Sequence, residues 1–294
     1  MSFKSIIKLM DIKTLVAGIV PVILGSIYSK YAFGKFNILY FILLIVAMIL
    51  IQSATNMVND YSDFKSGADN KKSGNEKALV SGEITSKQVL VTIFLFQLIA
   101  CMIGIFIASQ TSYYILIVAI IGGIISISYA FGPFPISYTP FGEAVAGITM
   151  GIGITTTVIY IQSGAINLNT FLVAIPTVIY ISTILLSNNI SDLQEDREVG
   201  RKTLPILLGV KNAEKLWIIN VIIILVLTFI LVLVHIYPIV VLVTVLIFFP
   251  YKSIIDFISY DKNMNTKGRT MGLISKIGLK YHLSVIVEIG RAHV

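Results

Sequence analysis

The sequence predicts an all-α fold, a polytopic bundle of transmembrane helices. Apolar residues make up 56% of the 294 residues and charged residues only 13%, and the mean hydropathy is +0.90. A soluble domain carries about 25% charged residues, so this chain lacks the polar surface that water requires. The apolar excess also excludes a disordered chain, which needs low hydrophobicity and high net charge. Lipid is therefore the predicted solvent.

Eight apolar stretches are each long enough for a membrane-spanning helix, which takes about 20 residues. In chain order they cover residues 14–33, 37–57, 89–109, 112–131, 144–161, 168–188, 216–236 and 238–256. A ninth apolar stretch starts at Leu279 and stops after about two turns, which is too short to span a bilayer. The closing letters EIGRAHV resemble a translated sequencing adapter. We therefore predict one membrane domain over residues 1–287 and a non-native tail over residues 288–294.

The positive charges are distributed unevenly between the two sides of the predicted bundle. A formal net charge of +7 is also typical of proteins that bind nucleic acid. Here, however, nearly all Lys and Arg residues fall in segments on the side of the N-terminus, whereas Lys30 and Lys35 fall on the other side. Cytoplasmic loops carry such an excess. The sequence thus predicts a cell-membrane protein with a cytoplasmic N-terminus, and nucleic acid is not an expected partner.

Most of the acidic residues gather in two of the predicted cytoplasmic segments, which resemble each other. NMVND (residues 56–60) ends the second span and NNISD (residues 188–192) ends the sixth, 132 residues later. Each has an Asn, three further residues and then an Asp. This predicts a four-plus-four internal repeat, an architecture that places the site at the repeat interface. Ordinary charged loops at helix ends are the alternative interpretation.

Helical geometry gives the spacing a chemical meaning. Asn56, Asp60 and Asp63 stand at i, i+4 and i+7, which is one face of a helix. Asn188, Asp192 and Asp196, at i, i+4 and i+8, form a second such face. Two acidic faces repel each other unless a cation lies between them. Carboxylate oxygens suit Mg²⁺, which joins proteins to substrate phosphates, and the interleaved basic residues can hold phosphate oxygens. These bases are Lys65, Lys71, Lys72, Lys77, Arg197, Arg201 and Lys202.

With these motifs the chain resembles the UbiA-type intramembrane prenyltransferases. NDYSDFKSGAD (residues 59–69) is similar to the NDxxDxxxD element of that superfamily, and Asp192 to Asp196 is similar to its DxxxD element. The continuation RKTLPILLG (residues 201–209) supports the match. Within the superfamily the sequence most resembles the 1,4-dihydroxy-2-naphthoate polyprenyltransferases of menaquinone synthesis. It departs from the pattern at Gly67, where an Asp is expected two residues before Asp69, and at Asp11-Ile12, where Arg-Pro is expected.

The resemblance implies nine transmembrane helices, the ninth being incomplete here, around a cavity open to lipid. It also implies a Mg²⁺-dependent enzyme that transfers a polyprenyl chain from polyprenyl diphosphate to an aromatic acceptor, 1,4-dihydroxy-2-naphthoate, with release of diphosphate and carbon dioxide. The residues assigned to metal and diphosphate are Asn56, Asp60, Asp63, Asn188, Asp192 and Asp196, of which the four aspartates are the predicted catalytic residues. Residues predicted to contact the diphosphate directly are Lys65, Arg197 and Lys202, and Asn59 is included in the binding site as a member of the first motif.

The connection between the fourth and fifth spans is rich in aromatic residues and in helix-breaking Gly and Pro. Its aromatic residues form either an acceptor pocket that shields a carbocation or an interfacial belt; they are Tyr129, Phe131, Phe134 and Tyr138. Glu143, which follows, either orients or deprotonates the acceptor or is an interfacial surface carboxylate. Trp217 is interpreted as an interface anchor.

Two groups of alternative functions remain open at this point. Other acceptors used within the superfamily are 4-hydroxybenzoate, haem, chlorophyllide and a glycerophospholipid precursor. A cation-coupled transporter also combines repeats with intramembrane acids. The clustering of acids with basic partners at one membrane face favours the enzyme.

Overall fold

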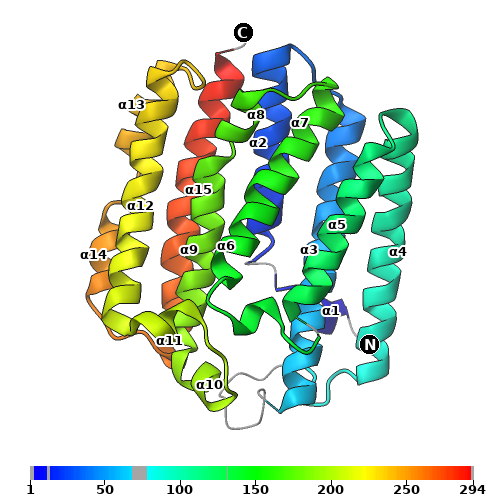
Figure 1. The fold of residues 1–294 in the computed structure, drawn as a ribbon, viewed down its shortest axis with the longest axis vertical. Coiled ribbons are helices and arrows are strands. Elements are labelled where there is room, and N and C mark those ends of the chain that lie inside the picture. Colours follow the sequence, from blue (N-terminus) through cyan, green and yellow to red (C-terminus); the bar gives the residue numbers. More distant parts are fainter. Residues whose placement is uncertain (1–2, 12–13, 68–77, 131, 293–294) are drawn as a thin grey trace. The chain divides into compact units, whose positions relative to one another are not determined.

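The computed structural model describes residues 3–11, 14–67, 78–130 and 132–292, and its elements over these ranges are all helical (Figure 1). The predicted all-α fold is confirmed. The α-helices are α1 (Phe3–Met10), α2 (Val16–Phe33), α3 (Ile38–Ser66), α4 (Ser86–Gln110), α5 (Tyr114–Ala130), α6 (Gly142–Gly147), α7 (Thr155–Ser163), α8 (Leu168–Leu172), α9 (Ile175–Ser191), α10 (Leu193–Glu198), α11 (Leu204–Leu208), α12 (Val210–Leu233), α13 (Ile239–Phe248), α14 (Lys252–Ile258) and α15 (Lys267–Arg291). A π-helix, η2 (Ile148–Ile154), joins α6 to α7, and short 3₁₀ helices are η1 (Ile136–Tyr138) and η3 (Met264–Thr266).

The chain divides into two compact units. One unit contains Met1–Ile19 and Ile42–Ile136, and the other contains Val20–Phe41 and Ser137–Val294. Most of α2 thus belongs with the second half of the chain, so the units do not follow the halves of the predicted four-plus-four repeat. That repeat and the single membrane domain over residues 1–287 stay predictions.

Among the described residues, six helices or runs of adjoining helices are long and apolar enough to cross a membrane. Two of the six are joined runs, α6–η2–α7 and α8–α9. A seventh span results if the bent pair α13–α14 counts as one. This pair bends by 48° around the Phe249–Pro250 break, where proline cannot continue a helix. The fourth predicted span corresponds to α5, which is apolar but has only 17 residues. All eight predicted spans therefore coincide with helices, but nine spanning helices are not confirmed.

The last helix is longer than the sequence analysis predicts. We expected helical structure from Leu279, yet α15 begins at Lys267 and continues for 25 residues. Its first half carries charged residues, so a search for apolar runs misses it. Thr270, Ile274 and Ile277 nevertheless recur at helical spacing and are buried. Residues 288–291 continue this helix, and the predicted non-native tail stays a prediction.

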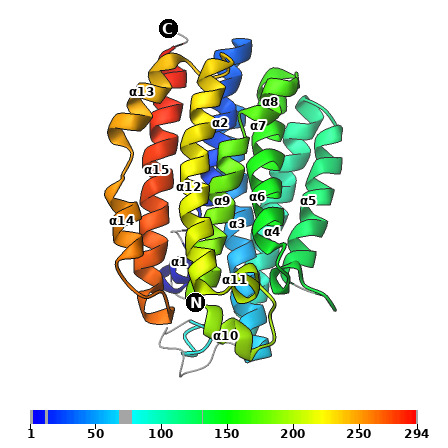
Figure 2. The ribbon, with the colours of Figure 1, turned by 60° about the vertical axis from the view of Figure 1, so that its left-hand side comes forward.

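In the second unit, α9 packs against α6, η2, α12 and α15 (Figures 1 and 2). Close packing against α9 depends on glycine. A Cβ on Gly151 of η2 would come within 2.7 Å of backbone atoms of Val178, and a Cβ on Gly278 of α15 would overlap the ring of Tyr180. These small residues set the position of α9, whose end carries the second acidic element.

Trp217 is a core residue in the second unit, so its interpretation as an interface anchor is wrong. Its side chain has no exposed surface, and its ring stacks on Phe257 at 3.8 Å between centroids. The indole Nε1 donates a hydrogen bond to Ser187 Oγ of α9 at 2.8 Å. An aromatic residue near a span end resembles a belt residue in sequence, but here it joins α12 to α9 and α14.

Candidate functional site

The first acidic element lies near the end of α3, in the first unit. Asn56, Asp60 and Asp63 belong to one continuous helix, as predicted from their spacing. Asn56 Nδ2 donates hydrogen bonds to Met10 O at 2.8 Å and Thr14 Oγ1 at 2.7 Å. These bonds connect this face of α3 to the N-terminal segment. Asp60 and Asp63 are half-buried.

The neighbours of this element differ in exposure. Asn59 is half-buried, whereas Lys65 is exposed with its Nζ 5.9 Å from the ring centroid of Tyr61. Their contact with diphosphate stays a prediction. Asp69, Lys71, Lys72 and Lys77 lie outside the residues that the structure describes.

The second acidic element lies where α9 ends, in the second unit. The helix stops at Ser191, and Asp192 separates it from α10, so the predicted helical face is interrupted at Asp192. The backbone N–H of Asp192 still donates to Asn188 O, and that of Asp196 to Asp192 O. In addition, Asn188 Nδ2 donates to Asp192 Oδ2 at 2.9 Å. These hydrogen bonds connect Asn188, Asp192 and Asp196 despite the break in the helix.

Two cations pair with these carboxylates. Lys267 Nζ, at the start of α15, lies 2.6 Å from Asp192 Oδ2, and Arg201 Nη1 lies 2.8 Å from Asp196 Oδ1. The Arg201 guanidinium also lies over the ring of Tyr138 at 4.8 Å. Sequence reasoning named Arg201 only as a neighbouring base and missed Lys267. Lys267 and Asp192 are 75 residues apart in the chain, so local spacing in the sequence does not predict their ion pair.

The two basic residues near the second element that the sequence predicted to contact the diphosphate do not pair with its carboxylates in this way. Arg197 and Lys202 are both exposed. The backbone N–H of Lys202 donates to Tyr138 O at 2.8 Å, which attaches the segment after α10 to the aromatic connection. Direct contact of these two side chains with substrate stays a prediction.

One oxygen of each carboxylate in the second element is buried and has no hydrogen-bond partner among the described residues. These atoms are Asp192 Oδ1 and Asp196 Oδ2. Burial raises the pKa of Asp196 to about 6, against the lowering effect of Arg201. Buried anionic oxygens without donors are costly, and a divalent cation with oxygen ligands would satisfy them. The residues of the second element thus fit a hard metal ion.

No group of three or more His, Cys, Asp or Glu side chains is placed to hold a metal within residues 3–11, 14–67, 78–130 and 132–292. The two acidic elements lie in different units. A metal site built from both elements therefore stays a prediction.

Glu143, at the start of α6, is buried with 4% of its surface exposed, so its interpretation as a surface carboxylate is wrong. Asn189 Nδ2 donates to Glu143 Oε1 at 2.9 Å, and Ser182 Oγ donates to the Glu143 carbonyl at 2.9 Å. Glu143 Oε2 is buried without a partner among the described side chains. The carboxylate is therefore held against α9, one turn before Asp192.

The aromatic residues of the connection do not share one environment. Tyr129 and Tyr138 are half-buried, Phe134 is 87% exposed and Phe131 lies outside the described residues. The ring of Tyr138 contacts the guanidinium of Arg201, the cation that pairs with Asp196. Roles for Tyr129 and Tyr138 at a substrate stay predictions.

Residues 18–272 match the UbiA prenyltransferase family, a range that includes both acidic elements. The chain belongs to this family. Of the curated relatives, a 1,4-dihydroxy-2-naphthoate octaprenyltransferase from Bacillus subtilis (strain 168) is 39% identical over 201 residues, which cover 68% of this chain. UbiA prenyltransferase domain-containing protein 1 from Homo sapiens is 30% identical over 195 residues, 66% of this chain. The matched regions span 64% and 57% of these relatives, respectively.

Solved structures of UbiA homologues share the fold. A UbiA homologue from Aeropyrum pernix K1 matches with a TM-score of 0.71 over 94% of this chain and 98% of its own, at 16% identity. A UbiA homologue from Archaeoglobus fulgidus, bound to GPP and Mg²⁺, matches with a TM-score of 0.62 over 96% of this chain and 99% of its own, also at 16% identity. Together with the apolar helices, family membership makes this chain a multi-pass membrane protein.

Proposed function

We propose that this UbiA-family protein transfers a polyprenyl chain from polyprenyl diphosphate to 1,4-dihydroxy-2-naphthoate, with Mg²⁺ as cofactor. The observation that carries the proposal is the buried Asp192–Asp196 pair, which has two oxygens available for a metal and two cations beside it. The relative from Bacillus subtilis supports the choice of acceptor. The homologue bound to GPP and Mg²⁺ supports the choice of donor and metal.

The proposed reaction begins with cleavage of the allylic carbon–oxygen bond. The electron pair of that bond leaves with the diphosphate, and positive charge develops on the prenyl carbon. The naphthoate ring carbon that bears the carboxylate then forms the new carbon–carbon bond. Loss of carbon dioxide returns its bonding electron pair to the ring and restores aromaticity. The products are diphosphate, carbon dioxide and a prenylated dihydroxynaphthalene, the reduced form of demethylmenaquinone.

The side chains of this protein have distinct parts in that reaction. Asp192 and Asp196, with Asp60 and Asp63 of the first element, would hold the metal–diphosphate. When bound, Mg²⁺ supplies charge that stabilises the leaving diphosphate, an effect worth several kcal/mol in a site without water. Arg201 and the Lys267 ammonium would add positive charge on the same side. The ring of Tyr138 would offer its face to the developing carbocation.

The proposal is tested by an incorporation assay in vesicles made from cells that lack their own enzyme. Radiolabelled farnesyl diphosphate, which is charged and does not cross lipid, is supplied with dihydroxynaphthoate and Mg²⁺.

The positive-inside distribution further leads us to propose that both acidic elements face the cytoplasm. Inverted vesicles should then form lipid-soluble product and intact right-side-out vesicles should not, with EDTA abolishing and Mg²⁺ restoring activity. Vesicles that take up substrate but form no prenylated naphthalene would contradict an enzyme and favour a transporter.

A substitution tests which arginine acts at the diphosphate site, Arg201 as the structure indicates or Arg197 as the sequence predicts. Arg201→Lys removes the planar group that lies over Tyr138 and donates to Asp196, which lysine cannot reproduce. We expect product formation to fall on the order of tenfold, a loss typical of one charge-assisted hydrogen bond. Arg197→Lys is the matched control, because Arg197 is exposed, and should stay near the wild-type rate. A larger loss in Arg197→Lys would restore the sequence-based assignment.

A further inference from the structure

A partly open cavity of about 230 Å³ lies at the beginning of α12, where that membrane-spanning helix meets α14 and the segment after it. Its lining consists of basic and apolar side chains together with one carboxylate. The lining includes Lys211, Glu214, Lys215 and Lys262, together with Phe257 and Ile258. The cavity thus combines charged and apolar side chains, next to the first turns of a helix long and apolar enough to span a membrane.

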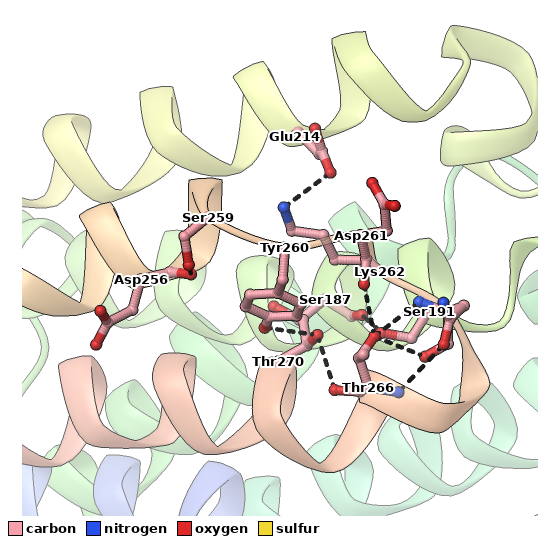
Figure 3. A network of polar contacts seen from close by, with 11 residues as sticks. Ser187, Ser191, Glu214, Asp256, Ser259, Tyr260, Asp261, Lys262, Thr266 and Thr270 are labelled. Atoms are coloured by element: carbon pink, nitrogen blue, oxygen red, sulfur yellow. Dashed lines mark hydrogen bonds and ion pairs between the residues drawn. The ribbon is translucent and has the colours of Figure 1, made fainter.

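The single carboxylate that lines the cavity is already neutralised. Lys262 Nζ lies 3.0 Å from Glu214 Oε1, and the lysine side chain is only 2% exposed. Figure 3 shows Lys262 reaching from the segment after α14 to Glu214 on α12. The same ammonium lies 4.4 Å from the ring centroid of Phe257. Lys262 is therefore held by the fold, and its charge balances that of Glu214.

Two positive charges of the cavity remain uncompensated. Lys211 and Lys215 are exposed, stand one turn apart on α12, and have no ion-pair partner among the described residues. Like charges at i and i+4 on a helix repel each other and destabilise it. An anion bound between the two ammonium groups would convert this repulsion into attraction.

The surface beyond the lysines is apolar and faces outward. Along α12, Ile219, Ile222 and Val226 follow Lys215 at helical spacing, and each is 50% exposed. On α14, Ile255 and Ile258 are 68% and 62% exposed. A ligand seated at Lys211 and Lys215 would therefore extend along hydrocarbon-compatible surface.

We propose that this cavity binds the headgroup of an anionic phospholipid, with its phosphate between Lys211 and Lys215 and its acyl chains along the outer face of α12. Basic pockets between transmembrane helices at the cytoplasmic face bind such headgroups. The unpaired charges of Lys211 and Lys215 favour an anionic ligand, and the exposed apolar face of α12 favours an anion that carries acyl chains. None of the lining residues belongs to the second acidic element, so the cavity is a different set of side chains.

The only tryptophan of the chain gives the proposal a local probe. Trp217 stacks on Phe257, and Phe257 lines the cavity. The full chain is reconstituted in phosphatidylcholine bilayers that contain a small fraction of phosphatidylglycerol. In one sample the phosphatidylglycerol carries dibrominated acyl chains, and in the other an equal fraction of the phosphatidylcholine does. Bromine quenches nearby tryptophan, so we expect stronger quenching from the brominated anionic lipid. Equal quenching by the two lipids would overturn the proposal.

A matched pair of variants assigns the binding to the cavity. Replacing both Lys211 and Lys215 by Gln should remove the excess quenching and weaken the apparent affinity for phosphatidylglycerol on the order of tenfold. The control replaces Lys276 and Lys280 by Gln, an exposed i, i+4 pair on α15 with the same charge change, and should keep the excess. Circular dichroism checks that both variants are folded. Excess quenching that persists in the Lys211/Lys215 variant would overturn the proposal.

Two soluble competitors distinguish the source of the phosphate. Geranyl diphosphate that restores the fluorescence would assign the cavity to the prenyl donor, and inorganic phosphate that restores it would assign the cavity to a free anion. Either result would overturn binding of a phospholipid. Because no acceptor is present and no product is measured, the outcome is independent of the proposed prenyl transfer.

Discussion

Replacing Asp192 by Asn should reduce prenyl transfer a hundredfold to a thousandfold, the loss typical when one electrostatic contact to a transition state is removed. Asn has nearly the same size as Asp but no charge. The substitution therefore removes an anionic metal ligand and leaves the Lys267 ammonium, 2.6 Å away in the wild type, without its counter-charge. The rate is measured as incorporation of labelled prenyl diphosphate over a range of Mg²⁺ concentrations.

The control for this prediction is Asp261→Asn, which neutralises an exposed carboxylate in the same unit. Its rate should equal that of the wild type. Thermal unfolding in detergent establishes that both variants are folded. If Asp192→Asn keeps a wild-type rate at every Mg²⁺ concentration, Asp192 is not part of the metal–diphosphate site.

Replacing Gly151 by Ala should lower the stability of the second unit by about 1–3 kcal/mol, as overpacking of a closely packed interface does. The new Cβ would lie 2.7 Å from the N and Cα atoms of Val178, and backbone atoms cannot move away as a flexible side chain can. In a thermal melt this corresponds to a decrease in Tm of roughly 5 °C. Because Val178 lies on α9, which ends immediately before Asp192, we expect activity to fall as well.

Gly153→Ala is the matched control, since Gly153 lies in the same π-helix but a Cβ there would meet only Ile148 O, at 3.9 Å. Its Tm should equal or slightly exceed that of the wild type, because Ala loses less conformational entropy than Gly on folding. Equal melting temperatures for the two variants would show that η2 and α9 are not in close contact.

The acidic elements could be recognised in the sequence because their chemistry depends on local spacing. Asn56, Asp60 and Asp63 share a face of α3 as their i, i+4 and i+7 positions require. The same argument was less accurate for Asn188, Asp192 and Asp196, where the helix breaks at Asp192. Local hydrogen bonds still keep these three residues together.

Charge partners over long distances in the chain could not be predicted in this way. Lys267 pairs with Asp192 from a different helix. The basic residues named from sequence as diphosphate contacts, Lys65, Arg197 and Lys202, are all exposed, which spacing alone does not reveal. Trp217 is a comparable case: a tryptophan near a span end fits an interface anchor, but packing of α14 against α12 buries it on Phe257.

The sequence by itself determined the solvent, the helical class and the two acidic elements. These follow from composition, from the length of apolar runs and from the 3.6-residue period, all of which are local properties of the chain. Only the tertiary structure decided which cations face the carboxylates, which oxygens stay without donors, and that α15 begins at Lys267. These features depend on how helices distant in the chain pack together. Close contacts at glycines such as Gly151 and Gly278 set that packing, and a glycine's neighbours in space are not visible in its neighbours in sequence.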